Sequence, residues 1–189
     1  MACELTFDIE AHRGGRAVLP ENTLPAFANA LSMGVNTLEL DIGITADGEA
    51  IISHERGLNP DLARDAKGDY VAAPGTPFIK LRLDEVRTWD VGQIRPDSAY
   101  ARQFPDQRAI AGTRIPTLKQ LFALVRKSGN SCVRFNIEAK IDPNHSDIVG
   151  WPANKAILVF VMRGGRIEIA KNGELEVTLP IGVMTKVSS

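Results

Sequence analysis

Hydrophobic and polar residues alternate in several short segments along the first 141 residues, and a period of two is typical of β-strands. These segments span residues 5–12, 36–42, 49–54 and 132–140. Two other segments, which begin near Thr23 and Thr117, carry apolar residues at the spacing of an amphipathic helix and are followed by Gly34 and Gly129. The order of these elements predicts an α/β fold.

Two stretches depart from this alternation of strands and helices. Residues 55–116 are rich in Gly, Pro, Asp and Arg, with one short helical candidate at 83–89, so we expect a long insertion outside the core. Residues 148–189 contain apolar or alternating segments joined by Gly-Gly and Asn-Gly, which are typical of β-hairpins. We therefore expect residues 1–147 to form one unit and residues 148–189 to form an antiparallel β meander of unknown role.

Polar side chains gather near the C-terminal ends of three predicted strands, on the face opposite the aliphatic residues. His12 ends the first strand, Glu39 and Asp41 lie in the second, and Glu138 and Lys140 lie in the last. If the strands are parallel and covered by helices, these ends meet around one catalytic spot. An ordinary antiparallel sheet with one solvated face would show the same alternation without any function. The coincidence of three such ends favours a shared site.

The acidic side chains of this group indicate a divalent cation. Glu39 and Asp41 are two residues apart on a strand and point the same way, so their repulsion must be relieved by protonation or by a cation. With Glu138 they offer the hard oxygen ligands that suit Ca²⁺ or Mg²⁺. No cluster of thiolates or histidines indicates zinc.

The first and third predicted strands each end in a histidine, His12 and His54. Imidazole titrates near neutral pH, so two histidines can share general-base and general-acid roles, although a lone histidine at a strand end is more often structural. The Gly14–Gly15 pair leaves the backbone open, and Arg13 and Arg16 supply charge that suits phosphate oxygens. Together with a metal site, these features predict a phosphate ester as the substrate.

Composition excludes several other classes of protein. The 22 basic and 23 acidic residues give a net charge of -1, so no basic field is present that would bind nucleic acid. No run approaches the roughly 20 apolar residues of a membrane span. The N-terminus lacks the pattern of a signal peptide, so we expect a cytoplasmic protein, or a periplasmic or secreted one if a signal peptide was removed from a longer precursor.

Three motifs occur in a familiar order: "HRGGRAVLPENTLPAF", "GVNTLELDIGITADGEAIISHE" and "FNIEAK". Over residues 5–141 they strongly resemble the glycerophosphodiester phosphodiesterase family. The resemblance implies a TIM-type barrel that hydrolyses glycerophosphodiesters to glycerol 3-phosphate and an alcohol with the aid of Ca²⁺ or Mg²⁺. It also implies three groups of site residues: the acid/base pair His12 and His54, the metal ligands Glu39, Asp41 and Glu138, and the substrate contacts Arg13, Lys140, Glu21 and Asn22.

The length of the chain predicts an incomplete barrel, because a closed eight-stranded barrel takes ~250 residues and the family motifs end at residue 141. An open half barrel exposes strand edges. Either the tail covers them, a second copy does so in a homo-oligomer, or the chain folds poorly. We expect the tail to be a fusion or a frameshifted end joined to a truncated barrel; the alternative is that its "AILVFVM" segment pairs beside the last motif strand and its hairpins cap the opening. Two other functions stay open: an inactive fragment or binding module that keeps the metal site, and a phospholipase that acts on another lipid phosphodiester.

Overall fold

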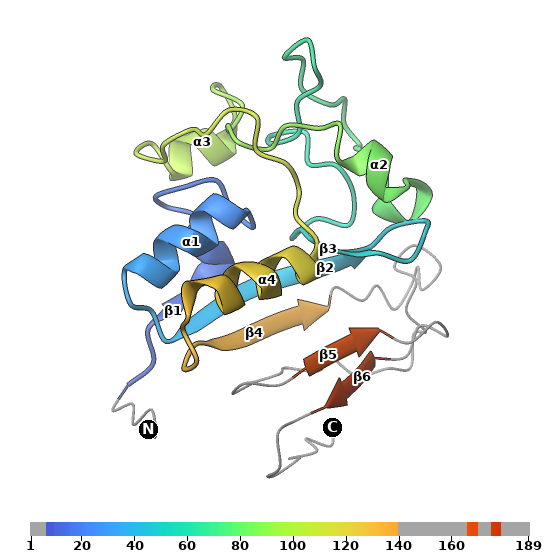
Figure 1. Cartoon of the computed structure of the whole chain (residues 1–189). Helices are drawn as coiled ribbons and strands as arrows, with labels where there is room; N and C mark the ends of the chain where they lie inside the picture. Colours follow the sequence, from blue (N-terminus) through green and yellow to red (C-terminus); the bar gives the residue numbers. More distant parts are fainter. Residues whose placement is uncertain (1–6, 140–165, 170–174, 179–189) are drawn as a thin grey trace, which may run out of the picture.

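The structure, a computed structural model, describes residues 7–139, 166–169 and 175–178. A four-stranded sheet is built around β2 (Thr37–Ile44), which pairs in parallel with β1 (Glu10–Ala11) and with β4 (Arg134–Ala139). Since Leu38 has a partner residue in both strands, β1 and β4 flank β2. β3 (Ala50–Ile52) pairs antiparallel with the C-terminal end of β2 (Figure 1). The predicted α/β class with a parallel sheet is confirmed.

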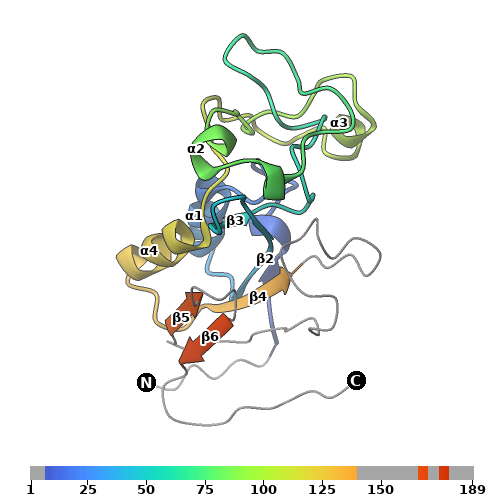
Figure 2. The same ribbon diagram turned by 90° about the vertical axis from the view of Figure 1, so that its right-hand side faces the viewer.

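Two helices cover one face of this sheet: α1 (Leu24–Ser32), between β1 and β2, and α4 (Leu118–Ser128), just before β4 (Figure 2). The main core lies between the helices and the sheet, and its fully buried large side chains are Phe27, Leu38, Leu40, Ile52 and Leu121. Burial of each such side chain stabilises the fold by about 1.5–3 kcal/mol. Because side chains alternate along a strand, this packing turns Thr37, Glu39 and Asp41 to the opposite face.

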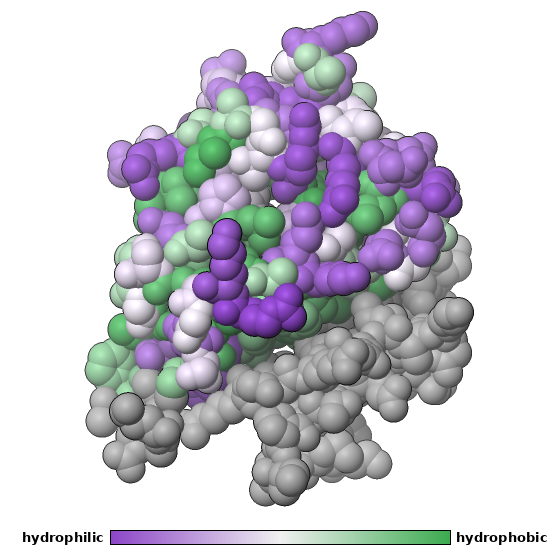
Figure 3. All heavy atoms as spheres, in the orientation of Figure 1, coloured by the Kyte–Doolittle hydropathy of each residue, from purple (hydrophilic) through white to green (hydrophobic). Residues whose placement is uncertain are grey.

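Both helices begin and end at the predicted residues. The Thr23 hydroxyl accepts a hydrogen bond from the amide of Ala26, and the Thr117 hydroxyl accepts one from the amide of Gln120. The Gln120 side chain in turn accepts from the amide of Thr117 at 2.9 Å, which completes a capping box. Gly129, with φ at 71°, follows α4 in the left-handed conformation that commonly ends a helix. Hydrophilic side chains cover the outer face of α4 (Figure 3).

The first predicted strand is longer than the observed one. Only Glu10 and Ala11 form β1, while Phe7 and Ile9 are 70% and 47% exposed instead of facing the core. The reason is the register: Glu10 pairs with Thr37, where β2 begins, so no residue of β2 remains to pair with the residues before it.

Residues 55–116 contribute no residue to the main core, in line with the expectation, but they build a second hydrophobic cluster of their own. They contain a 3₁₀ turn at Phe78–Lys80 and the short helices α2 (Leu83–Val86) and α3 (Ala99–Gln103). Their apolar side chains pack with a residue of β3 into a second hydrophobic cluster: Ile51, Leu58, Ala63, Phe78, Val86, Val91 and Ile115. The helical candidate predicted at 83–89 is present as the shorter α2, whereas the burial of the cluster depends on contacts between residues distant in sequence, which no local pattern predicts.

In the tail, β5 (Arg166–Ile169) and β6 (Leu175–Thr178) pair antiparallel in a separate two-stranded sheet. The rest of the predicted meander, including the "AILVFVM" segment, lies outside the described residues, as does the predicted substrate contact Lys140. Among the helices of the described part, none has the length and apolar character needed to cross a membrane.

One contact between the turn after β1 and α1 gives a prediction about stability. Gly14 has φ at +77°, and a Cβ there would lie 3.0 Å from Cδ1 of Phe27. Gly15 has φ at +92°, and nothing lies within 4 Å of its Cβ position. Gly15→Ala is therefore expected to lower the free energy of unfolding by about 1 kcal/mol, whereas Gly14→Ala adds crowding and costs about 2–3 kcal/mol.

Urea denaturation of the two variants beside the unsubstituted chain measures both values. Equal losses for Gly14→Ala and Gly15→Ala would contradict the close packing of this turn on α1.

Candidate active site

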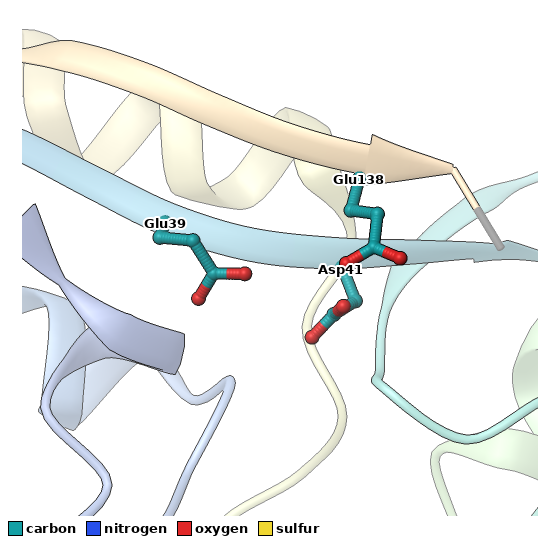
Figure 4. A group of neighbouring side chains, drawn as sticks. All are labelled: Glu39, Asp41 and Glu138. Atoms are coloured by element: carbon teal, nitrogen blue, oxygen red, sulfur yellow. The ribbon is translucent and has the colours of Figure 1, made fainter. Parts of the chain in front are cut away.

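Three carboxyl groups meet on the sheet face that the helices do not cover. Glu39 and Asp41 extend from β2 and Glu138 from β4, and each offers an oxygen within 4.8 Å of those of the other two (Figure 4). The parallel register causes this meeting, because Asp41 and Glu138 are direct partners across the two strands. Asp41 is 1% exposed and Glu39 is 9% exposed. The structure thus brings together the three predicted metal ligands.

The spacing and chemistry of this group fit a divalent cation. Two ligands of one ion lie at most two bond lengths apart, which is about 4.6–5.2 Å for Ca²⁺ and about 4.0–4.2 Å for Mg²⁺. The oxygens of the three carboxylates fall within the first range and need only small side-chain movements to reach the second. All three are hard oxygen ligands of the kind that Ca²⁺ and Mg²⁺ prefer.

Glu39 is held by the turn that follows β1. The backbone amide of Arg13 donates a hydrogen bond of 2.6 Å to Oε2 of Glu39, and Arg13 adopts a left-handed φ of 51°. The pKa of Glu39 is raised to about 7; burial is the main cause and the negative charge of Asp41 adds to it, while the hydrogen bond from the amide of Arg13 opposes the shift. Relief of this unfavourable charge by a cation would favour metal binding.

The side chain of Arg13 is already paired with carboxylates. Its Nη1 lies 3.1 and 3.3 Å from the two carboxylate oxygens of Glu21, and its Nε lies 3.6 Å from Oδ2 of Asp41. Burial raises the pKa of Glu21, and the charge of Arg13 partly offsets that shift. Two of the predicted substrate contacts, Arg13 and Glu21, therefore form one ion pair next to the predicted metal ligands.

Asn22, the third described substrate contact, links the same residues. Its backbone amide donates to the carbonyl of Arg13 at 2.9 Å, and its side-chain nitrogen donates to Oδ2 of Asp41 at 3.3 Å. Like Arg13 it has a left-handed backbone, with φ at 55°. Such conformations cost roughly 1–3 kcal/mol each and concentrate at functional sites. The Oδ1 atom of Asn22 is buried without a hydrogen-bond partner, so it is available to a bound ligand.

The two predicted catalytic histidines lie at the border of this group. His12 follows β1, and its Nε2 is 3.9 Å from Oε2 of Glu39. Partial burial lowers the pKa of His12, and the charges of Arg16, Arg13 and His54 lower it further. His54 follows β3, and its Nδ1 is 3.0 Å from Oε1 of Glu55, which leaves Nε2 for other partners.

A second polar layer on the same sheet face was not assigned from the sequence. Asn136 donates a hydrogen bond of 2.6 Å to Glu10, across β2. Asp8 accepts from the Thr37 hydroxyl at 2.9 Å and pairs with Arg134 at 2.6 Å. The period-two pattern placed these residues on the polar faces, but only the strand register shows which of them meet.

Comparison with known proteins places the chain in a family. A model of the glycerophosphoryl diester phosphodiesterase family matches residues 12–178, past residue 141 where the motifs end. A glycerophosphodiester phosphodiesterase of Caldanaerobacter subterraneus subsp. tengcongensis is 31% identical over 154 residues, which are 81% of this chain and 51% of the relative. Lysophospholipase D GDPD1 of Rattus norvegicus is 28% identical, over 71% of this chain and 36% of the relative.

Solved structures agree with this placement. A Silicibacter pomeroyi protein assigned to the glycerophosphoryl diester phosphodiesterases superposes with a TM-score of 0.70 and 34% identity, over 74% of this chain and 47% of that chain. A glycerophosphodiester phosphodiesterase of Agrobacterium tumefaciens shares the fold, with a TM-score of 0.51 and 23% identity, over 76% of this chain and 52% of that chain. These neighbours are TIM-barrel enzymes, and this chain spans about half the length of each. The chain belongs to the glycerophosphoryl diester phosphodiesterase family.

Proposed function

We propose that this protein hydrolyses glycerophosphodiesters to glycerol 3-phosphate and an alcohol, with the aid of Ca²⁺ or Mg²⁺. The observation that carries this proposal is the group of three carboxylates within 4.8 Å of one another, bordered by His12 and by the Arg13–Glu21 ion pair. The names of the relatives support the substrate class. The chain spans about half of the relatives' length, so the proposal concerns the activity of this half.

Glu39, Asp41 and Glu138 would hold the cation. A divalent ion at this place would polarise a phosphoryl oxygen and stabilise the negative charge that develops during hydrolysis. The amide of Arg13 fixes the orientation of Glu39, and the side-chain nitrogen of Asn22 does the same for Asp41. Hydrogen bonds of this kind hold ligands in position before the ion arrives.

The two histidines would divide the proton transfers. One imidazole accepts the proton of the oxygen that attacks phosphorus, and the other donates a proton to the alcohol oxygen as its bond to phosphorus breaks. The contact of Nδ1 with Glu55 leaves Nε2 of His54 as the nitrogen that exchanges a proton. Arg13 would share its guanidinium between Glu21 and a phosphate oxygen, since an arginine has five donors.

A second candidate function is hydrolysis of a lysophospholipid. The rat relative at 28% identity is a lysophospholipase D, and the same metal and histidines would serve for a lipid phosphodiester. A third candidate is a module that binds metal without turnover, for which the three clustered carboxylates alone would suffice. Product analysis separates all three.

The first prediction here concerns turnover. With Ca²⁺ or Mg²⁺ present, the protein is expected to release glycerol 3-phosphate from glycerophosphocholine, and a chelator is expected to abolish the release. His12→Ala should lower kcat by about 10²–10⁴-fold, the usual contribution of a general acid or base, while metal binding persists. Release of choline from lysophosphatidylcholine alone would support the second candidate. Metal binding without any product would support the third.

The second prediction concerns pH. Burial raises the pKa of Glu39 to about 7 in the metal-free protein, so a proton must leave this group when a cation binds. Affinity for Ca²⁺ is expected to be nearly constant above pH 8 and to fall below pH 7 by up to about tenfold per pH unit. Isothermal titration calorimetry between pH 5.5 and pH 8.5 measures this trend. In Glu39→Gln the binding should be weaker and the slope near pH 7 should be lost; an unchanged slope would contradict the assignment.

The third prediction concerns stability. Ca²⁺ at 100 times its dissociation constant is expected to stabilise the folded protein by about 2.7 kcal/mol, seen as a rise in Tm. Asp41→Asn should remove this rise, because it replaces a buried carboxylate ligand. Asp84→Asn is the matched control, since Asp84 lies on α2 with a side chain 77% exposed. A full metal-induced rise in Asp41→Asn would contradict the proposed ligand.

A further inference from the structure

Arg16 is held beside the candidate active site by residues from the 55–116 segment. Its guanidinium carbon lies 4.9 Å from the centroid of the Phe104 ring, just after α3. The side-chain nitrogen of Gln107 donates a hydrogen bond of 2.6 Å to the carbonyl of Arg16. The backbone amide of the next residue, Arg108, donates a hydrogen bond of 3.0 Å to the carbonyl of Val18. Residues 104–108, about ninety residues away in sequence, thus fix the position of the turn that also carries His12.

The charge of Arg16 is not compensated by an acidic partner. Within the described ranges, its guanidinium is half-buried and forms no ion pair with a carboxylate. Arg13 differs, because Glu21 and Asp41 lie against it. The backbone amide of Arg16 donates a hydrogen bond of 3.3 Å to the carbonyl of His12, and the charge of Arg16 lowers the pKa of His12 and of Glu21, two residues of the candidate active site.

The electrostatics of the proposed reaction require such a cation. The three carboxylates, when ionised, carry one more negative charge than a divalent cation neutralises. An approaching phosphodiester anion is repelled by this excess, and the guanidinium of Arg13 is already engaged by Glu21. A second guanidinium offsets the repulsion, and its planar set of donors fits phosphate oxygens.

We propose that Arg16 is a second phosphate-binding residue and that Phe104 is a positioning residue, which holds the Arg16 guanidinium towards the phosphate of the substrate and product. This inference rests on the proposed function, because it names a group that recognises the anion of the same reaction. The product monoester carries more negative charge than the diester. Arg16 therefore contributes more to the binding of glycerol 3-phosphate than to the binding of the diester.

The experiment measures the affinity of the Ca²⁺-loaded protein for glycerol 3-phosphate by isothermal titration calorimetry. Arg16→Gln is expected to weaken binding by about tenfold or more, as for loss of a charged hydrogen bond. Arg16→Lys, which keeps the charge without the planar donors, should lose less. Phe104→Leu should weaken binding by about three- to tenfold, whereas Phe104→Tyr keeps a ring beneath the guanidinium and should restore it.

Arg102→Gln is the matched control, because it removes the same charge from an exposed position on α3, where the side chain contacts only the carbonyl of Asp97 among the described residues. Its affinity for glycerol 3-phosphate should stay within about twofold of the unsubstituted protein, as expected for a surface charge. Equal weakening in Arg102→Gln and Arg16→Gln would show a general effect of net charge and overturn the proposal.

The remaining outcomes are equally decisive. If Arg16→Gln binds glycerol 3-phosphate as tightly as the unsubstituted protein, Arg16 does not contact the phosphate. If Arg16→Gln loses affinity and Phe104→Leu does not, the positioning role of Phe104 is wrong. Because binding is measured without turnover, failure of the proposed hydrolysis is distinguishable: a protein that binds glycerol 3-phosphate through Arg16 and hydrolyses no diester overturns only the proposed function. Unchanged affinity for Ca²⁺ in each variant shows that the fold is intact.

Discussion

The register between β2 and β4 is the constraint on which the candidate active site depends. It sets Asp41 directly against Glu138, with Glu39 two residues earlier on the same face, so that three carboxyl groups lie within 4.8 Å of one another. Such a concentration of negative charge in a buried place is unfavourable in the absence of a counterion. The raised pKa of Glu39 is one expression of this cost. A divalent cation would relieve this repulsion, and the relief would contribute to the free energy of ion binding.

The loop between β1 and α1 places hydrogen-bond donors and positive charge against these carboxylates. Its left-handed residues, Arg13 and Asn22, direct a backbone amide at Glu39 and a side-chain amide at Asp41. The guanidinium of Arg13 is paired with Glu21, whereas Arg16, in the same turn, has no carboxylate partner among the described residues. The left-handed backbone of this segment is held in place by the packing of Gly14 against α1 and by the contacts of Arg16 with Phe104 and Gln107. Stability of the turn and the proposed recognition of phosphate would therefore depend on the same contacts.

Local patterns predicted much of this arrangement. Period-two alternation assigned Glu39, Asp41 and Glu138 to one face, and Thr117 with Gly129 marked both ends of α4. Other features depend on contacts between distant residues and leave no local signal. The shortening of β1 follows from where β2 begins, and the burial of Phe78 follows from packing against Ile51. The contact of Arg16 with Phe104 joins two segments that are separated in sequence by α1, by β2 and β3, and by most of the 55–116 segment.

The most direct test of the central claim is the position of a bound ion. A crystal structure of the protein grown with Ca²⁺, with an anomalous difference map, is predicted to show one ion within about 2.3–2.6 Å of an oxygen of Glu39, of Asp41 and of Glu138. An ion held by other residues at full occupancy, or three carboxylates that bind no ion at saturating Ca²⁺, would contradict a cation site built by the register of β2 and β4.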